Sequence, residues 1–282
     1  MPFKRMVIIG AGLVGGSLGL AARQRALVGH VVGVGHRQSS IDKALAVGAV
    51  DSGSLDPAAA VEGADLVVVA TSVGLIPQML RDVAGKLSPG CIVTDVGSTK
   101  AMIVREAESA LRHGTHFVGA HPIAGSDRRG IDHARADLFV GSLCVLTPTD
   151  RTDREALARV ERLWRAVGAE VRMLDAASHD AILARTSHLP HAVAAALVEV
   201  LEGGDAPFVG TGFSDATRIA GGDPTLWVDI LMSNREAVLT AASRFQGRLD
   251  QLVRALEECD AEAVRTFLTR ARDRRENLAR PR

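Results

Sequence analysis

A histidine followed directly by a proline stands in the segment VGAHPIAGSD, residues 118–127. An imidazole titrates near neutral pH and can take up a proton under physiological conditions. Pro122 fixes the backbone beyond His121, as expected where the direction of a side chain matters. Taken alone, His121 is equally compatible with a turn histidine that has no chemical role. The neighbouring motifs must decide between the two interpretations.

The segment IIGAGLVGGSLG, residues 8–19, carries the spacing G-x-G-x-x-G after an apolar run and before a helical pattern. In this context the first glycine makes a tight turn, the second lets the backbone approach a pyrophosphate, and the third allows close helix packing. The pyrophosphate then lies at the start of the helix. We therefore predict a dinucleotide site that uses Gly10, Gly12, Leu13, Val14 and Gly15.

The next apolar run reads VVGVGHRQSS, residues 31–40, and has no acidic residue before Asp42. NAD enzymes place a carboxylate at this point to hold the ribose diol. Here a basic and hydroxylated set replaces it, and such groups suit a 2′-phosphate. An exposed polar turn is the alternative. We predict NADP, with NAD second, bound by His36, Arg37, Ser39 and Ser40.

Further polar side chains follow the later apolar runs, in ATSV (residues 70–73) and TDVGSTK (residues 94–100). Ligands of open α/β sheets bind at the carboxyl ends of the strands, so Thr71, Ser72, Ser98 and Lys100 are expected at the same crevice as the glycine loop. His121 is expected to end the following strand there. A histidine beside a nicotinamide suggests a base that removes a hydroxyl proton as hydride leaves.

Elements that could position these groups alternate along residues 6–175, where short β-branched runs are separated by helical periods. This pattern predicts a doubly wound, mostly parallel sheet of the Rossmann type over residues 1–175. Residues 176–282 are helical in pattern and are expected to form an all-helical domain for substrate binding and dimerisation. Residues 192–201 are expected to be buried. An apolar stripe from Trp227 to Leu256 predicts one helix of about thirty residues, too long for one small domain to cover.

Composition excludes several classes of partner. The chain has 33 basic and 33 acidic residues among 282, which gives no electrostatic reason to expect nucleic acid or an anionic membrane. Its three cysteines are widely spaced and are expected to be reduced thiols. The absence of a signal-like start and of long apolar runs predicts a soluble, cytoplasmic protein.

Five blocks occur in order along the chain and together resemble prephenate and arogenate dehydrogenases: the glycine loop, DVGSTK, GAHPIAGSD, SHDAILARTSHLPHAVAAAL and FSDATRIAGGDPTLWVDILMSN. The resemblance spans residues 6 to about 250. It implies NAD(P)-dependent oxidative decarboxylation of a cyclohexadienol, either arogenate to tyrosine or prephenate to 4-hydroxyphenylpyruvate. Hydride passes to the nicotinamide and carbon dioxide leaves as the ring becomes aromatic.

The resemblance also implies roles for individual residues. His121 accepts or holds the proton of the ring hydroxyl, Ser98 orients that hydroxyl, and Arg218 binds a substrate carboxylate. The remaining residues that it places around the substrate are Asp127 at the mouth of the pocket, Asp215 near the arginine, His179, His188 and His191 on the helical side, and Trp227 and Asp229 in the wall behind.

Two positions depart from the family pattern. Ser214 stands where some relatives carry a second arginine, and His36–Arg37 replaces the acid of NAD-using members and is similar to NADP-using arogenate dehydrogenases. His188 and His191 could instead form a metal pair, but no third ligand has suitable spacing, so no metal is expected. His179 could simply cap a helix.

Two other functions compete with this interpretation. Enzymes that oxidise 3-hydroxyacids pair a similar nucleotide domain with helices, but they resemble one another in using a lysine there. The four lysines of this chain are Lys4, Lys43, Lys86 and Lys100, none of them in the helical part. The other alternative is a redox-sensing NADP-binding regulator, in which His121 and Arg218 would have no purpose.

Overall fold

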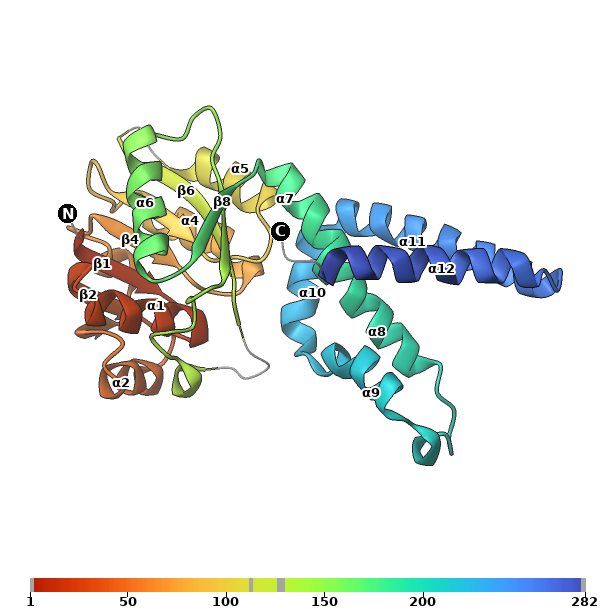
Figure 1. Cartoon of the computed structure of the whole chain (residues 1–282). Coiled ribbons are helices and arrows are strands. Elements are labelled where there is room, and N and C mark those ends of the chain that lie inside the picture. Colours follow the sequence, from red (N-terminus) through yellow and green to blue (C-terminus); the bar gives the residue numbers. More distant parts are fainter. Residues whose placement is uncertain (1–2, 112–113, 126–129, 280–282) are drawn as a thin grey trace. The chain divides into compact units, whose positions relative to one another are not determined.

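The computed structural model describes residues 3–111, 114–125 and 130–279 (Figure 1). The chain divides into two compact units, Met1–Arg235 and Glu236–Arg282. The first unit contains the sheet, the helices around it and the helices α7 to α10, so every predicted site residue belongs to this unit. The predicted boundary after residue 175 stays a prediction.

The sheet of the first unit has the strand order β3-β2-β1-β4-β5-β6-β7-β8. Strands β1 to β6 run parallel, β7 is antiparallel to β6, and β8 is parallel to β7. This confirms the expected Rossmann-type sheet. The strands are β1 (Phe3–Ile9), β2 (Val28–Val34), β3 (Ser52–Ser54), β4 (Leu66–Val69), β5 (Ile92–Asp95), β6 (His116–Ile123), β7 (Leu143–Thr147) and β8 (Glu170–Met173).

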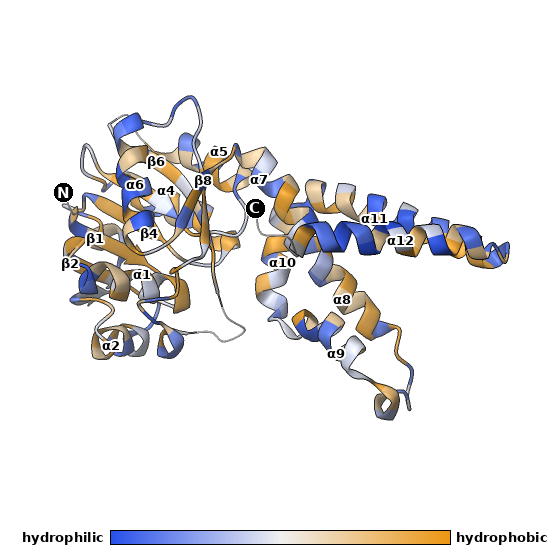
Figure 2. Ribbon diagram, in the orientation of Figure 1, coloured by the Kyte–Doolittle hydropathy of each residue, from blue (hydrophilic) through white to orange (hydrophobic). Residues whose placement is uncertain are grey.

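Helices cover both faces of this sheet, because successive strand residues point to opposite sides. Met6 of β1 belongs to one buried cluster, together with Leu18 of α1 and Trp164 of α6. Val7 belongs to a second cluster with Leu80 of α4. Figure 2 shows the hydrophobic character of the central strands. The helices are α1 (Leu13–Gln24), α2 (Gln38–Ala46), α3 (Pro57–Ala60), α4 (Ile76–Ala84), α5 (Ala101–Ala110) and α6 (Arg154–Ala166), with short 3-10 turns η1 (Val73–Leu75) and η2 (Ile131–His133).

Strand β6 differs from the prediction, which placed His121 at its end. The strand continues to Ile123, and His121 lies opposite Val145 of β7. Its pairing with β5 stops at the pair Thr94 and Val118. Pro122 has no N–H to donate, and a proline fits where one side of the strand is free of a ladder. His121 is therefore held inside a strand and is fixed more firmly than a turn residue would be.

A helical segment follows the sheet and supplies the three histidines of the helical side. It consists of α7 (Ala176–Leu183), the π-helical turn η3 (Ala184–His188) and α8 (Leu189–Glu199). Pro190 lies in the first turn of α8, where its missing N–H costs least, and the π turn accommodates this interruption. The expected burial of residues 192–201 is wrong within this unit, since Val200 is 73% exposed.

The predicted thirty-residue helix is interrupted at Asn234, which separates α10 (Pro224–Ser233) from α11 (Arg235–Glu257). The buried Asn234 side chain donates to the carbonyl of Asp180, a contact that the apolar stripe could not reveal. The remaining elements are η4 (Ala206–Phe208), α9 (Thr211–Thr217), η5 (Arg218–Gly221) and, in the second unit, α12 (Ala261–Ala279). Among the described residues, no helix is long and apolar enough to cross a membrane.

Candidate active site

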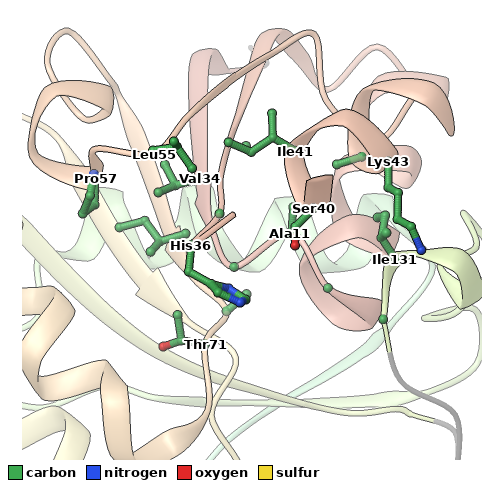
Figure 3. Close-up of a pocket in the computed structure, with 18 of the residues that line it drawn as sticks. Ala11, Val34, His36, Ser40, Ile41, Lys43, Leu55, Pro57, Thr71 and Ile131 are labelled. Carbon is green, nitrogen blue, oxygen red and sulfur yellow. The ribbon is translucent and has the colours of Figure 1, made fainter. Parts of the chain in front are cut away.

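A pocket of about 650 Å³ lies at the carboxyl ends of β1, β2 and β4 (Figure 3). The glycine loop contributes Gly10 and Gly12, and the end of β4 contributes Thr71 and Ser72, as predicted. Pockets of 300–1,000 Å³ are typical of small-molecule and cofactor sites. Its position, where the strand order reverses on either side of β1, is the dinucleotide position of a doubly wound sheet.

The glycines of this loop have the geometry that a bound pyrophosphate requires. Gly10 has φ +98°, and a Cβ there would lie 2.7 Å from the Ala70 carbonyl oxygen. A Cβ on Gly15 would lie 2.4 Å from the Gly10 carbonyl oxygen, so this residue permits close packing of helix α1. Gly12 has open space around it and precedes the first turn of α1. The loop therefore fits a dinucleotide. Leu13 and Val14 pack against the core and do not line the pocket.

The far end of the pocket carries the groups expected to select the cofactor. Gly35, His36 and Ser40 line it, together with Lys43 of α2. Figure 3 shows Lys43 extending toward η2, where its ammonium pairs with Asp132 at 2.6 Å. Arg37 and Ser39 are exposed and do not line the pocket.

A chain of three buried side chains lies at the neighbouring strand ends. His121 Nδ1 is 2.9 Å from His179 Nε2, and His179 Nδ1 is 2.8 Å from Asp180 Oδ1. Asp180 also accepts from the backbone N–H groups of Lys100 and Ala101, at 2.7 and 2.9 Å. His179 therefore does not cap a helix, because both of its ring nitrogens are used to connect His121 to a carboxylate.

Burial and neighbouring charge favour the neutral form of His121 and His188. His121 is 8% exposed, and its pKa lies well below the usual 6.5, first because of burial and then because His179, Lys100 and His188 lie nearby. Burial also lowers the pKa of His188 to about 4. A neutral imidazole is the form that can accept a proton.

His188 is tied to the same network through Asn234. The Asn234 amide nitrogen lies 3.1 Å from His188 Nδ1 and 2.8 Å from the Asp180 carbonyl oxygen. An amide NH₂ group donates, so His188 Nδ1 accepts and carries no proton. The interruption between α10 and α11 thus places Asn234 where it orients one of the histidines.

His191 and Trp227 form a separate cluster on the helical side. Their rings are stacked, with centroids 3.5 Å apart and planes inclined by 12°. His191 Nδ1 is buried and has no hydrogen-bond partner among the residues that the structure describes. Arg218 and Asp215 are exposed on η5 and α9, and η5 packs against α8.

The other predicted residues are placed as follows. Ser98 is half-buried in the connection from β5 to α5. Because β4, β5 and β6 are adjacent, Ser72, Ser98 and His121 follow one another along the same edge of the sheet. Asp229 lies against the backbone at Gly74, since a Cβ there would be 3.0 Å from its carboxylate. Asp127 lies outside the described residues. No group of three metal-ligating side chains occurs in the part of the chain that the structure describes.

Sequence reasoning missed Asp95, Asp180 and Asn234, all of which are buried in this network. Asp180 directly follows His179, and a histidine–aspartate pair in a mostly apolar helix was an available signal. Asp95 ends a buried strand, the position where a polar residue needs an explanation. Asn234 falls within the apolar stripe from Trp227 to Leu256, so a polar residue at an apolar position was the available signal.

Comparison with known proteins gives two family matches that together span most of the chain. Residues 18–173 match the nucleotide-binding domain of prephenate dehydrogenase, and residues 175–270 match its dimerization domain. The prephenate dehydrogenase of Bacillus subtilis is 31% identical over 97% of this chain and 76% of its own length. The cyclohexadienyl dehydrogenase of Zymomonas mobilis is 31% identical over 92% and 91%.

Solved structures agree with this assignment. A prephenate dehydrogenase from A. aeolicus, in complex with hydroxyphenyl propionate and NAD⁺, has a TM-score of 0.92 and 32% identity over 99% of both chains. A Synechocystis arogenate dehydrogenase has a TM-score of 0.85 and 31% identity over 98% of this chain and all of its own. A 3-hydroxyisobutyrate dehydrogenase from Salmonella typhimurium has a TM-score of 0.61 and 16% identity, so the similarity to it shows the fold alone. The chain belongs to the prephenate dehydrogenase family and is an NAD(P)-dependent oxidoreductase.

Proposed function

We propose that the protein oxidatively decarboxylates prephenate, arogenate or both, with His121 as the group that accepts the proton of the ring hydroxyl. The observation that carries this proposal is the buried chain His121–His179–Asp180 beside Ser98. A general base must be neutral, must be held in a fixed orientation, and needs a group that stabilises the positive charge it acquires. The hydrogen-bonded side chains of His121, His179 and Asp180 meet all three requirements.

The direction of the base follows from the hydrogen bonds. A carboxylate only accepts, so His179 Nδ1 donates to Asp180. His179 Nε2 is then the acceptor, and His121 Nδ1 donates to it. The unprotonated nitrogen of His121 is therefore Nε2, which is free to receive a proton. The positive charge that results is stabilised through His179 by Asp180, the arrangement known from carboxylate–histidine pairs in other enzymes.

When bound, the nicotinamide accepts the hydride that leaves the carbinol carbon. The protein must hold that carbon and its hydroxyl in line with the acceptor, and orientation of this kind can supply several kcal/mol. Ser98 orients the hydroxyl toward His121 from the adjacent strand end. Aromatisation provides the driving force, so the protein needs no strong acid.

Substrate binding is assigned to the helical side of the site. Arg218 offers two parallel N–H donors that suit a carboxylate. The unpartnered Nδ1 of His191 and the stacked Trp227 provide a polar atom and an aromatic wall. His188 and Asp215 complete this side, and Asp127 stays a prediction for the mouth of the pocket. Ser214, where some relatives carry a second arginine, is exposed and offers no charge to a second carboxylate.

We further propose that NADP is the preferred cofactor. The strand end that would carry the ribose-binding acid carries Gly35, and His36, Ser40 and Lys43 surround the space beside it. His36 and Ser40 can donate hydrogen bonds to a 2′-phosphate, and Lys43 carries a positive charge, which Asp132 in the same lining partly offsets. Arg37 and Ser39 lie next to this space and remain candidates for an outer contact.

The protein is proposed to form a homodimer through its helical region. Leu249, Val253 and Leu256 of α11, all in the second unit, are exposed by 47%, 43% and 59%. Large exposed apolar side chains on one part of a protein mark a surface that a partner covers. Light scattering at micromolar concentration should give twice the monomer mass.

The test of the proposed function is a steady-state comparison of prephenate and arogenate, each with NADP and NAD. Turnover of at least one substrate, with a higher kcat/KM for NADP, is expected. Absence of turnover with both substrates, in protein that binds NADP, would favour the regulator alternative and contradict the proposal.

A further inference from the structure

The carboxylate of Asp95 lies at the end of β5 and is completely buried. Its Oδ2 accepts from the backbone N–H of Gly97 at 2.8 Å, and its Oδ1 accepts from the backbone N–H of Ala120 at 3.1 Å. The Lys100 ammonium forms an ion pair with Oδ2. None of these groups lines the nucleotide pocket described above, so the expectation that Lys100 faces the crevice of the glycine loop is wrong, because its side chain is buried against Asp95.

These two backbone contacts are next to the two residues that handle the hydroxyl. Gly97 precedes Ser98, and Ala120 precedes His121. The backbone ladder between β5 and β6 stops at Thr94 and Val118, before either residue is reached. Beyond that pair, the Asp95 side chain links the segment after β5 to β6 through its bonds to the Gly97 and Ala120 N–H groups. A Cβ at Gly97 would lie 2.9 Å from Asp95 Oδ2, so glycine is required for this approach.

The Lys100 ammonium compensates the charge of the buried Asp95 carboxylate, and the Lys100 backbone links this pair to Asp180. Its side chain is also fully buried, and burial lowers its pKa while Asp95 raises it. A buried charge is strongly destabilising unless it is paired. The backbone N–H of Lys100 donates to Asp180, which holds His179 against His121. Asp95 and Lys100 therefore bond to Gly97, Ala120 and Asp180, the chain neighbours of Ser98, His121 and His179.

We propose that Asp95 and Lys100 are positioning residues that fix Ser98 and His121 relative to each other, so that both meet the substrate hydroxyl in the reactive geometry. This inference rests on the proposed roles of Ser98 and His121. A misplacement of about 1 Å can reduce a rate by roughly 10²-fold, so loss of this connection should affect turnover more than binding.

The positive charge of Lys100 also affects His121 directly, because it lowers the pKa of the His121 imidazole. The groups that face this imidazole are His179, His188 and Lys100, with Cys144 on the adjacent strand β7. Lys100 is the positively charged member of this set and disfavours the imidazolium. Removing it should raise the pKa of His121, an effect that a merely structural ion pair would not have.

The experiment compares Asp95→Asn and the double variant Asp95→Asn/Lys100→Met with the control Asp65→Asn. Asp65 is the same kind of residue at the opposite end of the sheet, where it accepts from the backbone N–H groups of Lys4 and Arg5, both at 2.9 Å. The double variant removes both charges and keeps the volume of the lysine, so it avoids an unpaired buried charge if the single variant fails to fold.

We expect both Asp95 variants to lower kcat by about 10- to 100-fold with an unchanged Kd for NADP. In the double variant the acid limb of the kcat/KM profile should move to higher pH, because the Lys100 charge that lowers the pKa of His121 is removed. Asp65→Asn should lower Tm and leave kcat unchanged. Unchanged kcat in a folded Asp95 variant, an unmoved acid limb, or an equal loss of kcat in the control would overturn the inference. If His121→Asn itself leaves kcat unchanged, the proposed function fails instead.

Discussion

Replacing Asp180 with asparagine should remove the negative charge that stabilises the proton accepted by His121. Asp180 Oδ1 accepts from His179 Nδ1 and from the Lys100 N–H at 2.8 and 2.7 Å, and Oδ2 accepts from the Ala101 N–H at 2.9 Å. An asparagine oxygen at the Oδ1 position keeps the first two bonds, so its NH₂ group faces the Ala101 N–H, a donor that it cannot satisfy. The hydrogen bonds then keep their direction, and the imidazolium of His121 loses the carboxylate that stabilises it through His179.

The size of the effect follows from the loss of one charge-assisted bond, worth about 1.5–3 kcal/mol. This corresponds to a decrease in kcat of roughly 10- to 150-fold. An unsatisfied backbone N–H at Ala101 should also cost about 1–3 kcal/mol of stability. The Kd for NADP should not change, because the nucleotide pocket is built from other elements.

The assay is stopped-flow and steady-state formation of reduced nicotinamide, with NADP affinity measured separately by fluorescence. Asp175→Asn is the matched control, since Asp175 lies in the same region and caps α7 through the Ser178 N–H at 2.8 Å. Asparagine caps a helix as well as aspartate does. A kcat for Asp180→Asn equal to that of the control would refute the relay from Asp180 to His121.

Three further predictions concern the cofactor, the substrate and pH. Gly35→Asp should place a carboxylate at the end of β2, where an added Cβ would have its nearest neighbour at 3.2 Å. The ratio of kcat/KM with NADP to kcat/KM with NAD should fall by about 10- to 100-fold. An unchanged ratio would contradict the assignment of this part of the pocket. Arg218→Ala should raise KM for substrate with little change in kcat, because its grip acts equally in the ground and transition states; an unaltered KM would place the carboxylate elsewhere. The free energy of unfolding should decrease by roughly 3 kcal/mol as pH falls from about 6.5 to about 4, because His188 is neutral when folded and takes up its proton more readily when unfolded. His188→Asn should flatten this slope in urea titrations, and an equally steep slope would show that another group is responsible.

The features that depend on hydrophobic periodicity and on short motifs could be predicted from the sequence. The alternating elements follow from local patterns, and the glycine loop and the polar end of β4 line one pocket, as expected. Ser98, after β5, does not line that pocket. The short strand β3 (Ser52–Ser54) was missed because serine and glycine carry no strand signal.

The wrong predictions have one physical cause. The features concerned are determined by contacts between residues far apart in the sequence, which local patterns do not show. His121 was placed at a strand end because the antiparallel partner β7 is remote in sequence. The helix through Asn234 was predicted to continue because the apolar stripe continues, while the buried amide contacts to Asp180 and His188 interrupt it. Burial of residues 192–201 was inferred from their apolar character, which does not distinguish a core from a surface that a partner covers.

The most direct test of the central claim is the kcat of His121→Asn with prephenate and with arogenate, at saturating NADP. Asparagine can still pair with His179, so the fold and the Kd for NADP should be retained. The account predicts a loss of kcat of roughly 10²–10⁴-fold, the range for removal of a general base, together with loss of the acid limb of the pH profile. A kcat equal to that of the parent protein, with the acid limb still present, would show that His121 is not the proton acceptor.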